Sequence, residues 1–449
     1  MKIFCHVGPW CVQQYQTIAK GVDANADVVI VSGFKSIDQS GLVSNYYENL
    51  QEQIPLDCIN EKYSEYKDII LRCRLLRVLG QKDAVSHLLA MKKAISCLFD
   101  REKPDLVISE TIDQYLMDLI YFECKGRGVP FIGLLVSFVN GYYRISARGE
   151  FNKLREVSSA EVEEVIRKLE AKNYRPNFVQ KSAKSTYTSA LSRWSKNTFR
   201  IPYFTFKRYF SGERYNYHYW ASQLSSINNF SFPPSVRIGS DDWRERIVSI
   251  RLPIIYLPLQ MFPEATIDYW CECLDVIDYD NKLIEYIKMF NGDFQFIIKE
   301  HPNVIGSRNP NLYKRLSNLD NVSICPLYVD SNDLVNLSDA VMVWTGSVGF
   351  EAALRGKPVI CVCKPFYASG KQFIKLRSNT DVEQIKSFIK NNSLPLDMIE
   401  KKDLVGNLLS GLLPGKYIND ASWNPTNPDD IKDGMKIGNQ IAVYLDGLK

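Results

Sequence analysis

The sequence contains no apolar run that approaches the ~18 residues a helix needs to cross a membrane. Residues 1–6 lead into a short strand pattern and lack the apolar core of a signal peptide. No Gly-x-Gly-x-x-Gly follows this strand, so the fingerprint of dinucleotide-binding domains is missing. These absences lead us to expect a protein that acts in the cytoplasm, or peripherally on the inner membrane.

Cysteine and histidine are poorly placed for a metal site. The eleven cysteines are scattered, and in the nearest pairs, Cys271/Cys273 and Cys361/Cys363, one residue separates the two cysteines. None of the four histidines lies near either pair, so we predict no metal centre. Cys361 and Cys363 alternate within an apolar run and are expected to be buried thiols, as in a reducing compartment.

The length and the charge bound the class of protein. A chain of 449 residues exceeds what one hydrophobic core usually supports, which predicts two domains. The apolar fraction of 45% and the charged fraction of 24% are ordinary for a globular protein. A net charge of +4 is too small to indicate nucleic-acid binding by itself.

Strand and helix patterns alternate in two regions of the chain, 1–150 and 246–400, which predicts two doubly wound α/β domains. In the first region, strands are expected at 2–6, 27–32, 106–109 and 129–135, and helices include 71–100 and 112–126. In the second region, strands are expected at 254–257, 294–299, 322–325, 341–344 and 359–362. Two such domains predict a cleft between their sheet edges, where ligands bind outside the carboxyl ends of the strands.

The regions outside these domains have their own patterns. Residues 151–245 are predicted to form a helical arm, beginning with a charged helix at 150–171, and 401–449 a tail with a closing helix. Within the arm, residues 181–215 carry eight Lys/Arg against one acid, Glu213, interleaved with aromatic residues. This segment is either a solvated helix or a contact surface for an anionic membrane or a lipid-linked acceptor.

The segment 345–360, Thr-Gly-Ser-Val-Gly-Phe-Glu-Ala-Ala-Leu-Arg-Gly-Lys-Pro-Val-Ile, is the most informative part of the chain. It predicts a tight turn after a strand, a short helix that ends at Gly356 and a second strand. The hydroxyls and amides of Thr345, Gly346 and Ser347 at a helix start suit a phosphate. Glu351 falls on the same helix face as Ser347 and could accept hydrogen bonds from ribose hydroxyls. An ordinary αβ unit with a polar cap is the alternative.

Two further clusters, 258–267 and 299–302, also follow predicted strands. His301 could donate to a phosphate or to a developing charge, and a purely structural histidine is the alternative. Glu264 follows a proline before a helical stretch and would project into the cleft; the alternative is a carboxylate favoured by the helix dipole.

In the first domain, Glu110 follows a strand and would face the cleft from the other side. After the next strand, the segment 140–150 contains Asn140, Arg144 and Arg148. The two arginines could bind an anionic sugar or a phosphate, because guanidinium groups match such oxygens. Helix capping or surface salt bridging is the alternative for each of these residues.

Together the clusters resemble the bacterial capsule polysaccharide biosynthesis proteins, which include β-Kdo transferases and related nonulosonic-acid transferases. The shared pattern comprises Gln-x-x-x-(Asp/Glu)-Ala-(Ser/Thr) at 260–266, Glu-His-Pro at 300–302, and a Thr/Ser-rich turn running into Gly-Phe-Glu-Ala and Arg-Gly-Lys-Pro-Val at 345–359. A following Pro-Phe-Tyr-Ala at 365–368 matches as well. The resemblance extends over about 250–375 and is thin in the first domain. Where many relatives have Asp, this chain has Glu264.

The resemblance implies a GT-B architecture of two Rossmann-like domains, with the donor held by 246–400 and the acceptor by 1–150. The residues expected to bind the donor are Gln260, Glu300, His301, Pro302, Thr345, Gly346, Ser347, Gly349 and Glu351. The residues expected to act in catalysis are Glu264, Glu110 and His301. Those expected to bind the acceptor or a sugar carboxylate are Asn140, Arg144 and Arg148.

The resemblance also implies the reaction, which is transfer of Kdo or another ulosonic or nonulosonic acid from a CMP-activated donor to a growing surface polysaccharide. Such enzymes neutralise the leaving nucleotide with helix termini and basic groups, so we expect metal independence and no cofactor. The expected partners are a nucleotide sugar and an oligosaccharide or lipid-linked glycan, without nucleic acid. The alternatives are a nucleotide-sugar 2-epimerase of the same fold and a non-catalytic polysaccharide-assembly protein.

Overall fold

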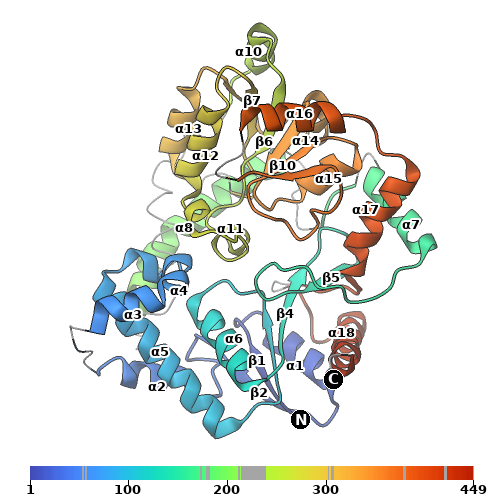
Figure 1. Cartoon of the computed structure of the whole chain (residues 1–449). Helices are drawn as coiled ribbons and strands as arrows, with labels where there is room; N and C mark the ends of the chain where they lie inside the picture. The colour runs from blue at the N-terminus through green and yellow to red at the C-terminus, as the bar shows by residue number, and fades with distance from the viewer. Residues whose placement is uncertain are drawn as a thin grey trace. The chain divides into compact units, whose positions relative to one another are not determined.

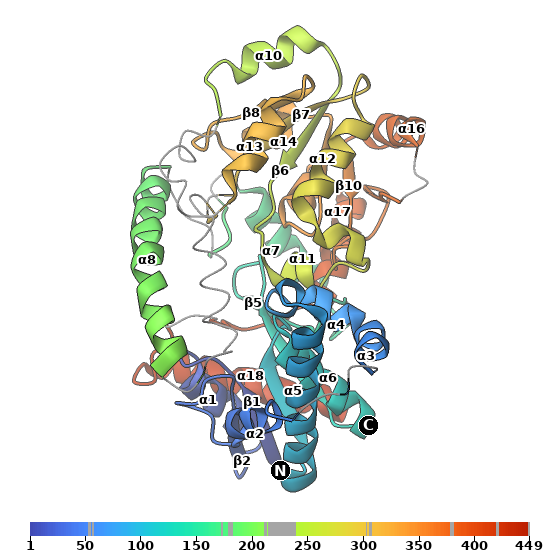
Figure 2. The same cartoon turned by 90° about the vertical axis from the view of Figure 1, so that its left-hand side faces the viewer.

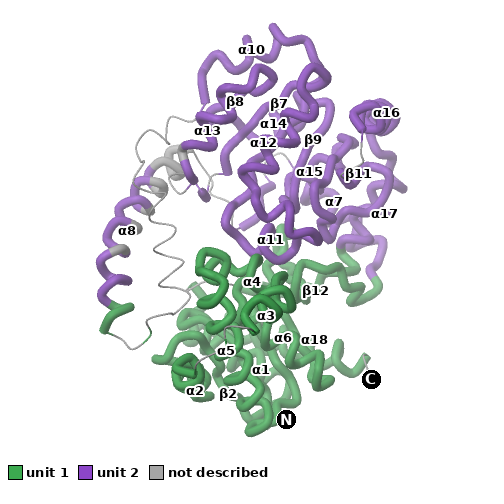
Figure 3. The backbone as a smooth tube through the Cα atoms, turned by 60° about the vertical axis from the view of Figure 1, so that its left-hand side comes forward, with its two compact units in different colours: residues 1–156, 207–221, 409–449 green, residues 157–206, 222–408 purple. Residues whose placement is uncertain are grey.

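A computed structural model describes residues 1–52, 55, 58–171, 174–177, 183–210, 213, 239–301, 303–304, 308–377, 381–418 and 422–447. The chain divides into two compact units, coloured separately in Figure 3. Unit 1 comprises 1–156, 207–221 and 409–449, and unit 2 comprises 157–206 and 222–408. The predicted closing helix, α18 (Pro428–Asp446), lies in unit 1, whereas α17 (Met398–Ser410), which was not predicted, ends where unit 1 resumes.

The described part of unit 1 contains a six-stranded sheet in the order β12-β5-β4-β3-β1-β2. Figure 1 labels β1, β2, β4 and β5 of this sheet. The strands are β1 (Lys2–His6), β2 (Asp27–Val31), β3 (Leu106–Glu110), β4 (Phe131–Val136), β5 (Tyr142–Ile145) and β12 (Leu413–Pro414). The first four are parallel, and β5 and β12 add antiparallel pairs at one edge. Because β1 lies between β2 and β3, the direction of the connections reverses between β1 and β3, which makes this pair the topological switch point of the sheet.

Helices cover both faces of this sheet. They are α1 (Val12–Val22), α2 (Leu42–Asn49), α3 (Ile59–Glu65), α4 (Lys67–Arg72), the 3₁₀ turn η2 (Leu76–Val78), α5 (Gln81–Glu102), α6 (Tyr115–Arg127) and α18. Alternate residues of β1 enter different cores, since Phe4 packs with α5 and α6 and Ile3 packs with α1 and α18. Gly438 of α18 lets the helices cross closely, because a Cβ there would lie 2.1 Å from the carbonyl oxygen of Ile18.

The described part of unit 2 contains a second six-stranded sheet, in the order β11-β10-β9-β6-β7-β8. Its strands are β6 (Ile254–Pro258), β7 (Gln295–Lys299), β8 (Val322–Ile324), β9 (Ala340–Val343), β10 (Val359–Cys361) and β11 (Phe373–Lys375), all parallel. Numbered from β6, the spatial order is 3-2-1-4-5-6, which is the Rossmann order, and the switch point lies between β6 and β9.

The remaining helices surround this second sheet or precede it. They are α7 (Ser159–Glu170), α8 (Ala183–Phe210), α10 (Trp243–Ile250), α11 (Ala265–Asp268), η4 (Leu274–Ile277), α12 (Tyr279–Met289), α13 (Pro310–Ser317), α14 (Ser331–Leu337), α15 (Val348–Leu354), α16 (Val382–Asn392) and α17. Residues of α12, α13 and α16 pack in one apolar core with Ile255 and Phe296 of the sheet. Among the described residues, no helix is long and apolar enough to span a bilayer.

The predicted fold of two Rossmann-like α/β domains is confirmed by these two sheets. Two local predictions were wrong. The helix expected at 71–100 is interrupted, because Cys73 and Leu79 have extended backbones and α5 begins only after Gly80. The helix expected from 150 begins at Ser159, where the hydroxyl of Ser158 accepts a hydrogen bond from the Glu161 amide. The short strands β5, β11 and β12 were not predicted.

Candidate functional site

Two of the three predicted motifs of unit 2 meet at its switch point. Gln260 follows β6 and Thr345 follows β9, two neighbouring strands of the sheet. The Nε2 of Gln260 donates to the Oγ1 of Thr345 at 3.3 Å, and that hydroxyl donates to the backbone oxygen of Thr266 at 3.1 Å. The two loops are thus joined where open α/β sheets bind their ligands.

Glu264 belongs to the same hydrogen-bonded group. It occupies the residue before α11, and its Oε2 accepts a hydrogen bond from the hydroxyl of Thr266 at 2.6 Å. The Nε2 of Gln260 also donates to this hydroxyl, at 3.4 Å. The carboxylate of Glu264 is therefore oriented at the sheet edge by a threonine that both loops contact.

Two glycines allow the turn after β9 to pack tightly. A Cβ added to Gly346 would lie 3.0 Å from the Oε1 of Gln260, and one added to Gly349 would lie 2.6 Å from the hydroxyl of Tyr367. That hydroxyl donates to the backbone oxygen of Gly346. Gly346 and Gly349, both predicted donor-binding residues, thus provide close approach, and Tyr367 clamps the turn.

The helix that follows this turn, α15, is short, as predicted. It has seven residues, and Ser347 precedes it without a side-chain cap. The amides of Gly349, Phe350 and Glu351 are bonded to the oxygens of Gly346 and Ser347 within the turn. Binding of a phosphate by Thr345, Gly346 and Ser347 stays a prediction.

Glu351 is the predicted ribose-binding residue on this helix. Burial of its carboxyl raises the pKa to about 7, with attraction by Arg355 acting in the opposite direction. Close to neutral pH the group therefore exists in both protonation states, and a ligand that prefers one of them will shift the balance.

Glu300, predicted to bind the donor, forms a buried ion pair with Arg308. The Arg308 Nε lies 2.6 Å from the Oε2 of Glu300, and the two side chains are 2% and 0% exposed. Arg308 also donates to the backbone oxygen of Gln260 at 2.5 Å, and the hydroxyl of Tyr313 donates to Glu300. Burial disfavours the charged guanidinium, but Glu300 outweighs this effect and raises the pKa of Arg308. The pair therefore ties the loop after β7 to the loop after β6.

The hydrogen bonds of His301 fix its neutral tautomer. Its Nδ1 accepts a hydrogen bond from the amide of Asn303 at 3.2 Å. In the neutral ring the proton must then be on Nε2, which becomes a hydrogen-bond donor. This is the form suited to the predicted contact with an anion. Pro302, also predicted to bind the donor, lies outside the described residues.

Glu110 lies at the switch point of unit 1. It ends β3, beside the end of β1, where the Nδ1 of His6 and the hydroxyl of Ser109 are 3.2 Å apart. Glu110 and His6 line one cavity, which also includes the aromatic ring of Trp10. Burial raises the pKa of Tyr417 well above its ordinary value, and the negative charge of Glu110 adds to this shift.

The predicted acceptor-binding arginines hold their own domain together. Arg144 of β5 is buried and donates to the backbone oxygens of Gly149 and Glu150. Burial lowers its pKa to about 9, and Glu150 partly opposes this shift. Arg148 forms an ion pair with the fully buried Asp118 of α6. Asn140 lies in the turn between β4 and β5. Binding of a sugar carboxylate by these three residues stays a prediction.

The thiol prediction for Cys363 was wrong, whereas Cys361 is a buried free cysteine as predicted. Cys363 forms a disulfide with Cys271, with a Cα–Cα distance of 5.3 Å. The bond joins the loop after β10 to the segment that follows α11. Thr266 lies in that helix. The disulfide was missed because each partner has a nearer cysteine in the sequence, while the true partners are 92 residues apart.

Within the described ranges, no group of three or more His, Cys, Asp and Glu side chains could hold a metal ion. The one Asp-x-Asp spacing, at Asp278 and Asp280, lies where α12 begins. The Oδ2 of Asp278 accepts from the side-chain amide of Asn281 at 2.7 Å, and burial raises the pKa of Asp280. Metal independence stays a prediction.

Comparison with known proteins supports the predicted family. Residues 237–370 match the family model "Capsule polysaccharide biosynthesis protein", which confirms the resemblance over the part of unit 2 that carries the three motifs. No curated protein matches the chain.

Solved structures with weak similarity include two transferases and an epimerase. The chain is similar to the KpsC β-Kdo 2,7 transferase of Thermosulfurimonas dismutans, with 14% identity over 100% of this chain and 99% of that chain and a TM-score of 0.39. The β-Kdo 2,4 transferase of the same organism shows 15% identity over 74% and 88%, with a TM-score of 0.35. The UDP-GlcNAc 2-epimerase of Methanocaldococcus jannaschii shows 13% identity over 91% and 99%, with a TM-score of 0.28.

Proposed function

We propose that this protein is a glycosyltransferase of capsule or other surface polysaccharide synthesis, and that it uses a CMP-activated ulosonic acid such as Kdo. The observation that carries the proposal is the bonded group formed by Gln260, Glu264, Thr266 and Thr345 at the switch point of unit 2. It lies within 237–370, the segment that matches the capsule polysaccharide family. The choice of a CMP-linked ulosonic acid follows from the resemblance of the motifs to Kdo transferases.

In this proposal, unit 2 binds the nucleotide of the donor. The Nε2 proton of His301 faces a phosphate oxygen, the hydroxyls of Thr345 and Ser347 complete the phosphate contacts, and Glu351 accepts hydrogen bonds from the ribose. Gln260 positions Thr345 through its 3.3 Å hydrogen bond. Fixed donors of this kind stabilise the charge that develops on the leaving nucleotide.

Glu264 is the proposed carboxylate at the sugar carbon, which becomes electron-poor as the nucleotide leaves. Its 2.6 Å hydrogen bond from Thr266 fixes its direction. Glu110 of unit 1 is the proposed group on the acceptor side. The reaction is proposed to need no metal ion, so an excess of chelator should leave nucleotide release unchanged.

A donor panel tests the proposal. CMP-, UDP-, GDP- and dTDP-sugars, including CMP-Kdo, are assayed for nucleotide release with surface oligosaccharides as acceptors and for thermal stabilisation of the protein. We expect CMP release from CMP-Kdo or a related donor. Stabilisation by UDP-sugars alone overturns the ulosonic-acid donor. Isomerisation of UDP-N-acetylglucosamine without nucleotide release identifies a 2-epimerase, and no response to any donor identifies a non-catalytic assembly protein.

A matched pair of variants links this result to the site. Thr345→Val removes the hydroxyl at the switch point with little change in volume and is expected to raise the Kd of the donor about tenfold. Thr198→Val removes a hydroxyl that bonds only within helix α8, to the oxygen of Trp194, and should leave the Kd unchanged. Equal donor affinities of the two variants would remove Thr345 from the proposed site.

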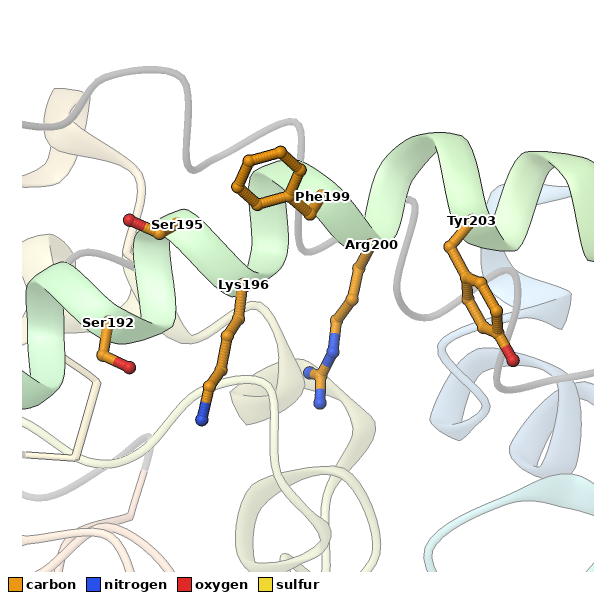
Figure 4. A pocket seen from close by; sticks show the side chains of 6 residues that line it. All are labelled: Ser192, Ser195, Lys196, Phe199, Arg200 and Tyr203. Atoms are coloured by element: carbon orange, nitrogen blue, oxygen red, sulfur yellow. The ribbon is translucent and has the colours of Figure 1, made fainter.

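The helix α8 is proposed to contact the anionic inner surface of the cytoplasmic membrane. It has six Lys/Arg and no acidic residue over 183–210. The spacing of Phe199, Tyr203, Phe206 and Phe210 places them on one helix face, where they are 76%, 55%, 59% and 73% exposed. Figure 2 shows the length of α8, and in Figure 4 Lys196 and Arg200 extend from the same side of it. Exposed aromatic rings beside basic groups match the boundary of an anionic bilayer.

Vesicle binding tests this contact. The full chain is expected to sediment with vesicles that contain phosphatidylglycerol and to remain in solution with phosphatidylcholine alone. The double variant Phe199→Ala/Phe206→Ala should lose binding. Tyr328→Ala, which removes an aromatic ring with 59% exposure outside α8, should retain it. Equal binding to both vesicle types would rule out the anionic surface as the partner.

A further inference from the structure

The cavity at the switch point of unit 1 has the features of a second ligand site. It is formed where β1, β2 and β3 end, and its lining includes His6, Trp10, Phe34, Glu110, Asp113 and Gln114. The direction of the strand connections reverses between β1 and β3 of this sheet. In open α/β sheets, ligands bind in the crevice at the strand ends beside such a reversal. The 3.2 Å contact between His6 and Ser109 joins the ends of β1 and β3 beside the cavity.

One wall of the cavity is aromatic. The rings of Trp10 and Phe34 are 6.3 Å apart in an edge-to-face arrangement, and the Trp10 side chain is 42% exposed. The Trp10 ring lies directly against Gly8, because a Cβ added there would be 2.6 Å from a ring carbon. An accessible aromatic face beside polar groups suits a ligand that has both an apolar face and hydroxyl groups.

The polar groups of the cavity point to the same kind of ligand. Gln114, the residue before α6, is only 8% exposed and lines the cavity. Its side-chain amide offers both a donor and an acceptor to a ligand in the cavity. An amide and a carboxylate together can donate to and accept from neighbouring hydroxyls.

The carboxylates of the lining disfavour an anionic ligand. Glu110 and Asp113 contribute two carboxylates, and the described ion pair within this group joins Asp113 to Arg74. An anionic sugar or a phosphate in the cavity would be repelled by the carboxylate of Glu110. This separates the cavity from the predicted sites for a sugar carboxylate at Arg144 and Arg148.

We propose that this cavity binds the terminal, uncharged sugar ring of the acceptor glycan, with the face of the ring on Trp10 and its hydroxyls on Glu110 and Gln114. The assignment as an acceptor rests on the proposed glycosyltransferase function. It implies that the enzyme adds its sugar to a neutral residue of the chain rather than to a sugar that carries a carboxylate.

Binding of simple glycosides to the full chain, without nucleotide, tests the proposal. The probes are the methyl β-glycosides of glucose, galactose and N-acetylglucosamine, together with the methyl glucuronide and galacturonide, measured by saturation-transfer NMR and tryptophan fluorescence. We expect at least one neutral glycoside to bind, and its uronide partner to bind at least tenfold more weakly. Binding of none of the neutral glycosides, or tighter binding of the uronides, overturns the proposal.

Variants locate the site. Trp10→Ala is expected to weaken neutral glycoside binding at least tenfold, and Glu110→Gln to reduce the discrimination against the uronide. Phe122→Ala removes a ring of similar exposure, 41%, from α6 outside the cavity lining and should have no effect. Unchanged binding to a folded Trp10→Ala protein overturns the assignment. If glycosides bind as expected but no nucleotide sugar is consumed, the glycosyltransferase function fails and the sugar site remains.

Discussion

The switch points of the two sheets lie in the same topological position, but the side chains around them differ. In unit 2 the side chains after β6 and β9 are bonded to one another, from Gln260 to Thr345 and from Thr266 to Glu264. In unit 1 the corresponding strand ends enclose a cavity with an exposed ring, Trp10, and a buried amide, Gln114. Topology therefore determines where a ligand can bind, and the side chains determine which chemistry it must have.

The two sites also differ in the burial of the ion pair that stabilises each of them. In unit 2, the ion pair of Glu300 and Arg308 is almost completely buried and reaches the loop of Gln260. In unit 1, the pair of Arg74 and Asp113 beside the cavity is partly exposed, at 14% and 43%. The site of unit 2 is thus pre-organised by its interior, whereas the cavity of unit 1 has a more hydrated margin.

The largest expected effect comes from breaking these two ion pairs. Arg308→Ala leaves the Glu300 carboxylate buried without its partner and is expected to lower the free energy of unfolding by about 3–5 kcal/mol. Arg74→Ala, at a partly exposed pair, should cost at most about 1 kcal/mol. Urea unfolding followed by tryptophan fluorescence compares the two variants. Equal losses would show that the two sites are held in the same way. Should Arg308→Ala fail to fold, Arg308→Lys is expected to show a smaller loss in the same assay.

The sequence predicted the positions of the unit 2 residues well, because each motif directly follows a strongly apolar strand pattern. Gln260, Thr345 and His301 could therefore be placed at the same sheet edge before any contact was known. Arg308 could not be found in this way, since it lies in a loop eight residues after Glu300 and has no periodic relation to it. The only signal was an arginine downstream of the Glu-His-Pro segment.

The first domain was harder to predict for a related reason. The sequence alone does not distinguish an exposed arginine that binds a ligand from a buried arginine that binds its own domain. The partner of Arg148, for example, is Asp118, which lies 30 residues away on α6. The cavity at Trp10 was missed because its lining comes from three separate strand ends. Short strands such as β5 have too few residues for a clear alternation.

A second test concerns the disulfide, which exists in unit 2 and has no counterpart in the described part of unit 1. Reduction of Cys271–Cys363 is expected to destabilise unit 2 by about 2–4 kcal/mol, because it frees a long loop in the unfolded chain. Hydrogen exchange of peptides from β6 to β10, with and without reductant, measures the loss, and peptides from β1 to β4 serve as the internal control. In the double variant Cys271→Ser/Cys363→Ser the reductant should have no effect. Equal changes in both units would contradict a local role.

A third test uses the tautomer of His301. If its Nε2 proton meets an anionic oxygen of the donor, His301→Ala should weaken donor binding by about 1.5–3 kcal/mol, or roughly 10- to 100-fold. His301→Gln can place an amide N–H near the position of Nε2 and should recover part of the affinity, whereas His301→Asn is too short to do so. Calorimetric titration with the preferred donor compares the three. Equal affinity of the Ala and Gln variants would contradict a contact through Nε2, and neutral glycoside binding in unit 1 should be unchanged in all of them.

The smallest effect distinguishes the two sites by pH. Because the pKa of Glu351 is raised above 4.5, to about 7, the stability linked to its neutral form is full below pH 4.5 and is lost as the pH rises through 7. A carboxylate that accepts ribose hydroxyls must be ionised, so donor affinity should rise by about tenfold from pH 6 to pH 8, with proton release on binding at pH 6. Titrations in buffers of different ionisation enthalpy measure both quantities. Glu351→Gln should abolish the pH dependence of donor binding and leave glycoside binding at Trp10 untouched; a pH dependence that persists in this variant assigns it to another group.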